Sequence, residues 1–329
     1  MRAPDFWSRC DWTAQVAANA LAPLGWLYGA ATDWKRRHTQ PYTAHAKVIC
    51  VGNLTVGGSG KTPVVLAITR MLQARQLQPV ILSRGYGGRV VDAMFVDRAV
   101  HRVADVGDEP LLLAAAAPVI VARDRRRGTA LADAHGADVI VMDDGHQNFA
   151  LAKNLSIVLV DAVSGFGNGR ILPAGPLREF VRNGLARAGA VVLVGEGSPA
   201  LPGYSGPVLR ARLVPSDGSV FSGRKLVAFA GIGRPEKFFA TLRTLHADLV
   251  GTISFGDHHV FHASEIARLK AKARNNNAML ITTEKDYVRL TPVEREGISV
   301  LPIRAQFDQP DVLQGLLDGV VQKIMKKSA

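Results

Sequence analysis

Short apolar runs alternate with helical patterns along most of the chain from Pro41 onward. Six of these runs are rich in valine and isoleucine, and each ends at a glycine or an aspartate. They span residues 47–52, 79–85, 118–124, 137–145, 155–161 and 190–195. Helical patterns lie between several of them, at residues 64–75 and 109–117. Continuous apolar strands separated by helices indicate a parallel sheet that is buried on both faces. The pattern predicts a doubly wound α/β domain.

The composition changes near residue 196. Residues 196–207 are rich in Gly, Pro and Ser and read as a loop or linker, and residues 208–226 could form two strands around a turn. A second α/β pattern then follows, with a final helix from about residue 310. The predicted division is an N-terminal apolar helix (1–40), a main α/β domain (41–206), a linker or two-stranded hinge (207–224) and a smaller α/β domain (225–329).

The N-terminal segment from Trp12 to Thr32 carries no charged residue. As a helix it would be roughly 31 Å long, close to the thickness of a bilayer core. Alanine, Gln15 and Pro23 make it only weakly hydrophobic, whereas tryptophans stand where interfacial anchors are usual. Three interpretations remain open: a helix in the membrane interface, a helix packed on the globular domain, and a cleaved signal peptide, which the early aspartates disfavour.

The charge balance favours an anionic partner. The 329-residue chain has 40 Lys+Arg against 28 Asp+Glu, a net charge of +12, which suits nucleic acid, an acidic membrane surface or a phosphorylated substrate. Aromatic residues make up 6 % of the chain, and no segment interleaves them with basic residues, so no nucleic-acid partner is expected. No pattern identifies an obligate protein partner. Cys10 and Cys50 are too few for a disulfide framework or a cysteine zinc site, and they indicate a reduced, cytosolic protein.

The segment "NLTVGGSGKTPVV" (53–65) follows the first predicted strand and opens a helix. A strict Walker A pattern would need glycine where Thr55 stands, but the strand–loop–helix context and the glycine pair support a phosphate-binding loop. We expect Lys61 to reach the β- and γ-phosphates and the Thr62 hydroxyl to bind Mg²⁺. The residues predicted to bind the nucleotide are Thr55, Val56, Gly57, Gly58, Ser59, Gly60, Lys61 and Thr62. Met142 stands where a GTPase D-x-x-G would need aspartate, and N-K-x-D is absent, so ATP is favoured over GTP.

Asp143 and Asp144 end the fourth predicted strand, at a Walker B-type position. One of them is expected to bind Mg²⁺ and the other to act as a base or a helix cap. Other polar residues follow the remaining strands, where ligands bind in such sheets, and arginines there would stabilise a transferred phosphoryl group. These residues are Arg84, Arg123, His146, Gln147, Arg178 and Glu179. In the second half, "SFGDHHVF" (254–261) brings a histidine pair to a strand end, without a third ligand at metal spacing.

Seven motifs occur in an order that resembles the tetraacyldisaccharide 4'-kinase family, the lipid A 4'-kinases. They are "GNLTVGGSGKTP", "SRGYGG", "VGDEP", "DDGHQN", "GRILPAGPLRE", "DHH" and "TTEKD". The resemblance covers residues 15 to 305 and includes the loop variant with Thr55. It implies a P-loop enzyme on the cytoplasmic face of the bacterial inner membrane, peripheral or anchored by its N-terminal helix, where anionic lipids are present. Such an enzyme transfers the γ-phosphoryl group of ATP to the 4'-hydroxyl of a lipid A disaccharide 1-phosphate.

The resemblance also assigns site residues. Asp108 of "VGDEP" matches the family's catalytic acid, and it is expected to work with His258 rather than His259. Asp143, Asp144 and Glu179 match acidic positions around Mg²⁺ and the phosphates. The residues expected to be catalytic are Asp108, His258, Lys61, Asp143 and Arg178. Those expected to bind the metal are Thr62, Asp144 and Glu179. Those expected to bind the substrate are Arg84, Arg123, His146 and Gln147. Two other classes stay open, a P-loop ATPase of the partitioning or metal-chaperone kind and a membrane-bound nucleotide sensor without turnover.

Overall fold

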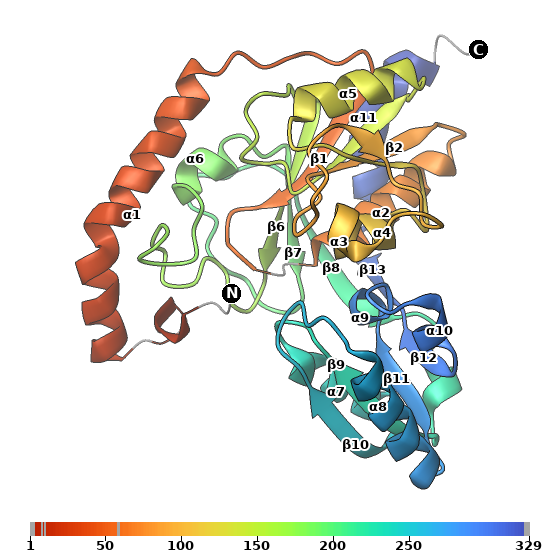
Figure 1. Ribbon diagram of the computed structural model, residues 1–329. Helices are drawn as coiled ribbons and strands as arrows, with labels where there is room; N and C mark the ends of the chain where they lie inside the picture. The colour runs from red at the N-terminus through yellow and green to blue at the C-terminus, as the bar shows by residue number, and fades with distance from the viewer. Residues whose placement is uncertain (1–3, 8, 10, 58–59, 326–329) are drawn as a thin grey trace.

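The chain folds into two α/β lobes with a long helix along one side (Figure 1). The computed structural model describes residues 4–7, 9, 11–57 and 60–325. Gly58 and Ser59 of the glycine loop, Cys10 and the last four residues lie outside this description. The N-terminal elements are a short 3-10 helix, η1 (Asp5–Trp7), and α1 (Trp12–His38).

The large lobe is built on one nine-stranded sheet, in the order β13-β8-β7-β6-β1-β5-β2-β4-β3. The strands are β1 (Lys47–Asn53), β2 (Pro79–Ser83), β3 (Met94–Phe95), β4 (Val119–Val121), β5 (Val139–Asp143), β6 (Leu155–Asp161), β7 (Ala190–Val194), β8 (Val208–Pro215) and β13 (Ile303–Phe307). Neighbouring strands run parallel except in the two edge pairs, β3–β4 and β13–β8. All six apolar runs of the sequence therefore form strands of one sheet, as predicted.

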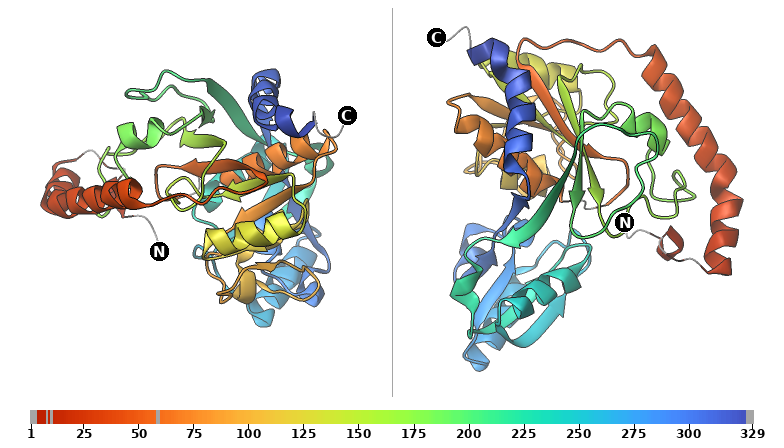
Figure 2. Two further views of the ribbon diagram at one scale, coloured as in Figure 1. Left: turned by 90° about the horizontal axis from the view of Figure 1, so that it is seen from above. Right: turned by 180° about the vertical axis from the view of Figure 1, so that it is seen from behind.

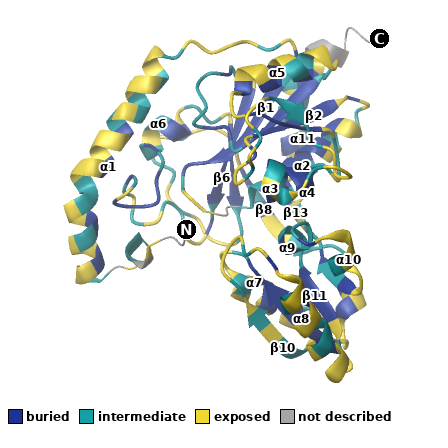
Figure 3. Cartoon of the chain, in the orientation of Figure 1, coloured by how far each residue is buried: buried dark blue, intermediate teal, exposed yellow. Residues whose placement is uncertain are grey.

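Helices cover both faces of this sheet, because its central strands are apolar on both sides. The helices are α2 (Lys61–Gln73), α3 (Val103–Val106), α4 (Asp108–Leu113), α5 (Arg125–Ala134), α6 (Val181–Leu185) and α11 (Pro310–Met325). One face packs against α2, α4 and α11, and the other packs against α5 and the segment that contains α6. Figure 2 shows α11 lying along the large lobe, and Figure 3 shows the buried strands between the helical layers.

The small lobe has a four-stranded parallel sheet in the order β10-β9-β11-β12. Its elements are η2 (Gly218–Phe221), β9 (Lys225–Ala230), α7 (Pro235–Thr244), β10 (Asp248–Ser254), α8 (Ala263–Asn275), β11 (Met279–Thr283), α9 (Glu284–Tyr287), α10 (Pro292–Arg295) and β12 (Ile298–Leu301). Helix α7 covers one face and α8 the other, each with its own apolar cluster. The α/β fold predicted from the sequence is confirmed in both halves of the chain.

Two parts of the predicted domain division are wrong. Residues 208–215 are not one arm of a hinge hairpin, because β8 pairs in parallel with β7 and antiparallel with β13 inside the large sheet. The C-terminal residues do not remain in the small lobe either, since β13 and α11 return to the large one. The small lobe is therefore an insertion between two adjacent strands of the large sheet.

Helix α1 packs against the large lobe through a line of small residues. Ala14, Ala18, Gly25 and Gly29 are buried, and a Cβ at Gly25 would stand 2.6 Å from the carbonyl oxygen of Ile171. The opposite side of the helix exposes large apolar side chains: Trp12, Val16, Leu24, Trp26, Leu27, Tyr28 and Trp34. None of the helices that the structure describes is both long and apolar enough to span a bilayer. The packed-helix interpretation thus accounts for one face of α1 and leaves the other uncovered.

Candidate active site

The site lies at the carboxyl edge of the large sheet, where β1, β5 and β2 end side by side. Val51 of β1 is the register partner of Asp143 of β5, and β5 pairs in turn with β2, which ends at Ser83. Since parallel strands end at one edge, the loops that follow them meet there. The glycine loop, Asp143–Asp144 and the Ser83–Arg84 turn are brought together in this way.

The glycine loop is described on both sides of Gly58 and Ser59. Gly57 has φ +117°, and nothing would lie within 4 Å of a Cβ there. Gly60 adopts the left-handed conformation (φ 76°) and precedes the first residue of α2. Thr55 forms an isolated bridge with Leu177, and the Val56 amide donates a hydrogen bond to the Pro176 carbonyl at 2.8 Å. The loop is therefore fixed at its start, and its last described residue leads into the N-terminus of α2, an end that can bind phosphate through backbone amides.

Lys61, Asp144 and Arg178 form one charged cluster at this helix end. Both carboxylate oxygens of Asp144 accept hydrogen bonds from Arg178 at 3.0 Å, and the Lys61 ammonium lies 3.6 Å from Asp144 Oδ1 and 3.4 Å from Asn53 Oδ1. Burial alone would raise the pKa of Asp144, but the charges of Lys61 and Arg178 outweigh it and lower that pKa. The cluster places two cations beside the phosphate loop, with an ionised carboxylate between them.

Asp143 points into a different environment. It is buried, its Oδ2 accepts from the Ser83 hydroxyl at 3.5 Å, and among the described residues its Oδ1 has no hydrogen-bond partner. The Asn53 amide nitrogen is likewise buried without a partner in the described chain. Burial, with the nearby acids Glu109 and Asp144, raises the pKa of Asp143 to about 7. A buried carboxylate oxygen without a partner, next to a phosphate loop, fits a position that a bound cation would complete.

Asp108 and His258 meet although 150 positions separate them in the chain. Asp108 is the first residue of α4 in the large lobe and is 4 % exposed, whereas His258 lies in the loop after β10 of the small lobe. The Nδ1 atom of His258 lies 3.1 Å from Oδ2 of Asp108. The family resemblance implied that Asp108 would work with His258 rather than His259, and the structure places Asp108 and His258 in contact.

The contact shifts the pKa of both partners. Burial alone would raise the pKa of Asp108, but hydrogen bonds from His258 and Arg289 and the charge of Arg289 outweigh it and hold that pKa below its usual range. The hydrogen bond to Asp108 raises the pKa of His258, against the smaller opposing effects of burial and of Arg289. Asp108 is therefore ionised, and His258 is the group of the pair that exchanges a proton near neutral pH.

Two further ion pairs join the lobes around this contact. Lys285 of the small lobe lies 2.7 Å from Glu109, and Arg234 lies 3.6 Å from Asp161 at the end of β6. In each pair the acid belongs to the large lobe and the base to the small lobe. The face between the lobes is thus complementary in charge.

Three of the sequence-predicted site residues have other partners. His146, predicted to bind substrate, is 1 % exposed, and its ring nitrogens contact the Ser156 hydroxyl at 2.7 Å and the Gly184 carbonyl at 3.0 Å. Burial lowers the pKa of His146 to about 3. The substrate prediction for His146 is therefore wrong, because its two ring nitrogens are already bonded inside the fold.

Gln147 and Glu179 also belong to an internal network. The Gln147 amide donates to the Asn53 carbonyl and to Glu179, each at 2.9 Å. Both oxygens of Glu179, which is 3 % exposed, accept from Arg187 at 2.7–2.8 Å. The predicted metal role of Glu179 and substrate role of Gln147 find no support in these contacts, which instead fix the end of β1.

Arg84 and Arg123 are exposed at the ends of β2 and β4, which are adjacent in the sheet. Arg123 donates one hydrogen bond, to the Gly88 carbonyl at 3.3 Å. Both side chains stand at the same edge as the charged cluster, where an anionic substrate group would arrive. Their predicted role in substrate binding remains a prediction.

Sequence reasoning missed Arg289, Lys285, Asn53 and Ser83. Arg289 donates to Asp108 from 181 positions away, and Lys285 reaches Glu109 across the lobes. Lys285 lies in the "TTEKD" motif and Arg289 follows it, so the motif was the available signal for both residues. Only the packing of the lobes shows what they contact. Asn53 ends β1 just before the glycine loop, and Ser83 ends β2 beside Asp143. Their positions at strand ends would have been the signal in the sequence.

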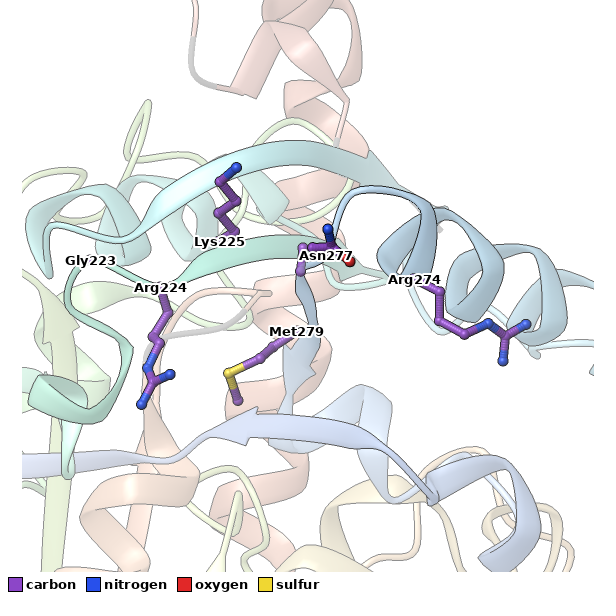
Figure 4. Close-up of a pocket in the computed structure, with 7 residues that line it drawn as sticks. Gly223, Arg224, Lys225, Arg274, Asn277 and Met279 are labelled. Carbon is purple, nitrogen blue, oxygen red and sulfur yellow. The ribbon is translucent and has the colours of Figure 1, made fainter.

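One open cavity of the described structure lies away from this site. It has a volume of about 630 Å³ and is lined by residues 223–225, 274 and 277–279, at the amino ends of β9 and β11. Figure 4 shows Arg224, Lys225 and Arg274 pointing in different directions around it. In the described parts of the chain, no group of three or more His, Cys, Asp or Glu side chains could hold a metal by itself. A metal at the site would therefore need ligands from the nucleotide, which is the usual arrangement for Mg²⁺.

Known proteins with similar sequence and structure identify the family. The model of the family described as "Tetraacyldisaccharide-1-P 4'-kinase" matches residues 17–322. A tetraacyldisaccharide 4'-kinase of Rhodospirillum centenum is 49 % identical over 96 % of both chains, and one of Bradyrhizobium diazoefficiens is 47 % identical over 99 % of this chain and 98 % of its own. The crystal structure of LpxK from Aquifex aeolicus in complex with ATP superposes with a TM-score of 0.76 and 25 % identity, over 92 % of this chain and 99 % of that chain. The chain therefore belongs to the tetraacyldisaccharide-1-P 4'-kinase family.

Proposed function

We propose that this protein transfers the γ-phosphoryl group of ATP to the 4'-hydroxyl of a tetraacyldisaccharide 1-phosphate, a lipid A precursor. The observation that carries the proposal is the 3.1 Å contact of His258 with Asp108 at the edge of the sheet that also bears Lys61 and Asp144. A proton-accepting pair and a phosphate loop at one edge are what phosphoryl transfer to a hydroxyl needs. Membership of the family agrees with this activity.

The acceptor hydroxyl is a weak nucleophile until it loses its proton. His258 donates Nδ1–H to Asp108, which leaves Nε2 to accept the hydroxyl proton. The acceptor oxygen forms a bond to the γ-phosphorus, the bond from that phosphorus to the β–γ bridging oxygen breaks, and ADP leaves. Lys61 and Arg178 stabilise the charge on the phosphoryl oxygens during this displacement.

Mg²⁺ fits the site through the Thr62 hydroxyl together with Asp143 or Asp144, in addition to nucleotide oxygens. When bound, it would supply further positive charge at the β- and γ-phosphates. Asp144 is already engaged by two cations, so a metal and Arg178 would share it, whereas Oδ1 of Asp143 has no hydrogen-bond partner among the described residues. We therefore assign the metal to this acidic pair and Thr62, and not to Glu179.

A phosphoryl-transfer assay tests the function. ATP labelled at the γ-phosphate is incubated with Mg²⁺ and detergent-solubilised tetraacyldisaccharide 1-phosphate, and the label is followed into lipid and water. Lys61→Ala should lower transfer roughly 100-fold or more, because it removes a charge-stabilising donor, while the matched control Lys225→Ala, at the far end of the small lobe, should act like the wild type. Label released only to water would indicate an ATPase, and binding without turnover would indicate a sensor.

We also propose that the protein works on the cytoplasmic face of the inner membrane, where this lipid precursor is available. The exposed apolar side of α1 ends in a basic turn, Lys35, Arg36 and Arg37, which suits anionic lipid headgroups. Closing of the small lobe over the acceptor would bring His258 to Asp108 in each cycle.

A further inference from the structure

The Arg289 guanidinium is held by several contacts on the face between the lobes. Its side chain is 5 % exposed, and it donates to the Gly231 carbonyl at 2.7 Å, to Asp286 Oδ1 at 2.8 Å and to Asp108 Oδ2 at 2.5 Å. Asp286 is held in turn by the Gly231 amide at 3.0 Å and the Thr283 hydroxyl at 2.7 Å. Two acceptors from the small lobe therefore aim Arg289 at one oxygen of the large lobe.

That oxygen is the one that His258 uses. Oδ2 of Asp108 accepts from both His258 and Arg289, and the Gly231 carbonyl accepts from the His258 backbone amide at 3.1 Å as well as from Arg289. His258 and Arg289 are thus fixed to the same backbone group and reach Asp108 as one unit. The Arg289 terminal nitrogen lies only 3.4 Å from Nδ1 of His258.

This spacing constrains the histidine tautomer. Nδ1 cannot donate to Asp108 and at the same time accept from Arg289, and the contact with Asp108 is the shorter of the two. With a donating Nδ1, the neutral ring presents its lone pair at Nε2. A fixed cation at this distance also disfavours a second positive charge on the ring.

We propose that Arg289 is a positioning residue of phosphoryl transfer: with Gly231 and Asp286 it holds Asp108 as an oriented carboxylate for His258, and its charge opposes protonation of the His258 ring by the acids beside it. This role rests on the proposed kinase function. Arg289 acts through Asp108 and His258 and does not itself contact the reacting atoms.

The charges that face His258 decide the sign of the expected effect. Asp108 and Asp257 favour the protonated ring, with Asp257 Oδ1 3.9 Å from Nε2, while Arg289 opposes it. The Tyr86 ring also faces His258, with 6.3 Å between centroids. Removing the charge of Arg289 leaves both acids unopposed, so the pKa of His258 rises. Because the proton-accepting ring must be neutral, the acid limb of kcat moves to higher pH.

The test compares the kcat–pH profiles of the wild type, Arg289→Gln and Arg289→Lys in the lipid phosphorylation assay, with near-ultraviolet circular dichroism to confirm folding. Arg289→Gln should move the acid limb of the kcat–pH profile to higher pH, because the charge that opposes Asp108 and Asp257 is lost. Arg289→Lys keeps the charge, so the acid limb of its kcat–pH profile should stay close to that of the wild type. Because lysine cannot bridge three acceptors, kcat should fall about tenfold.

A purely structural role would lower kcat equally at every pH. The proposal is therefore overturned if the acid limb of the kcat–pH profile of Arg289→Gln coincides with that of the wild type. It is also overturned if the acid limbs of both variants shift equally. If Arg289→Gln does not fold, Arg289→Lys decides alone: an unchanged KM for ATP with reduced kcat supports the role, and a KM that rises as much as kcat falls contradicts it. A wild type that transfers no label to lipid would instead refute the kinase function itself.

Discussion

Asp143 and Asp144 are neighbours in sequence, yet they have different electrostatic environments. Burial and nearby acids raise the pKa of Asp143, whereas Lys61 and Arg178 lower that of Asp144. The left-handed backbone at Asp144 (φ 50°) turns its side chain toward the glycine loop, while the Asp143 carboxylate remains buried beside Ser83. Two adjacent identical residues can therefore take separate roles because their surroundings differ.

His146 predicts an acid-sensitive stability. Its pKa is lowered to about 3 in the fold by burial, so between that value and its ordinary value of about 6.5 the unfolded chain binds a proton that the folded chain does not. Stability should fall as pH drops below about 6.5, by roughly 1 kcal/mol by pH 5.5. Urea unfolding at pH 7.5 and 5.5 measures this difference.

In His146→Gln the difference in unfolding free energy between pH 7.5 and pH 5.5 should be smaller than in the wild type by roughly 1 kcal/mol, although the variant is less stable overall. His45→Gln is the matched control, because the His45 side chain is exposed. Equal pH slopes for the wild type and His146→Gln would contradict the interpretation.

Local patterns and family motifs could predict which residues gather at the candidate site. Lys61 and Asp143 follow strands in recognisable patterns, and Asp108 and His258 belong to family motifs. His146 was misassigned because its partners, Ser156 and the Gly184 carbonyl, carry no signal in the sequence. The ion pairs across the lobes could not be predicted, since they depend on how two separate sheets are placed.

Among the elements, α1 combines a tightly packed side with an uncovered one. A Cβ at Gly29 would stand 2.5 Å from the side chain of Ile171 and 2.9 Å from that of Phe180. Gly29→Leu should therefore destabilise the docked helix by roughly 1–3 kcal/mol, as overpacking does, even though leucine is the better helix former. Thermal unfolding and limited proteolysis between α1 and β1 measure the loss.

Ala31→Leu is the matched control for this substitution, because Ala31 is exposed on the same helix. It should leave the melting temperature and the proteolysis pattern unchanged. A Gly29→Leu protein as resistant to protease as the wild type would show that α1 does not depend on the small-residue contact.

The exposed side of α1 predicts binding to lipid. Replacing Trp12, Trp26 and Trp34 together by alanine should lower co-sedimentation with vesicles that contain anionic lipid, because indole rings anchor at the interface. The melting temperature should not change, since these side chains are exposed. Alanine at Val91, Val100 and Val293, exposed away from α1, provides the control, and equal loss of binding in both triple variants would exclude α1 as the contact.

The strands show where element prediction from sequence succeeds and where it fails. Continuous apolar runs identify the buried parallel strands of both sheets, and α2 begins at Lys61, close to the predicted helix. Strand β8 has mixed burial because it lies near the edge of the sheet, so its pattern did not show which sheet it joins. Strand β13 follows β12 after only Pro302, and sequence proximity favoured the wrong lobe.

On the scale of the whole molecule, the two lobes meet through opposite charges. Asp108, Glu109 and Asp161 of the large lobe face Arg289, Lys285 and Arg234 of the small lobe. The Asp108–Arg289 pair is buried on both sides, whereas the other two pairs are partly exposed and contribute only roughly 0.2–1 kcal/mol each. Such weak pairs suit a cleft that must admit a lipid and release a product.

A charge swap tests this arrangement. Lys285→Glu alone places two acids together, so the radius of gyration in X-ray scattering should increase and kcat/KM should fall about tenfold or more, because like charges at an interface are costly. The double variant Glu109→Lys/Lys285→Glu restores an opposite pair and should recover the compact radius. Failure of the double variant to differ from the single one would mean that this pair does not hold the lobes together.

The antiparallel pairing of β8 with β13 has a consequence for how such enzymes can diversify. Pro215 and Ile303 are register partners, so both crossings to the small lobe leave from one point on the sheet. Residues 216–302 form one continuous segment of the chain, which includes His258 and Arg289 but no part of the glycine loop. A single recombination event could exchange this segment between relatives and leave the ATP-binding half untouched, so the proposed proton acceptor and the proposed positioning arginine can be inherited together.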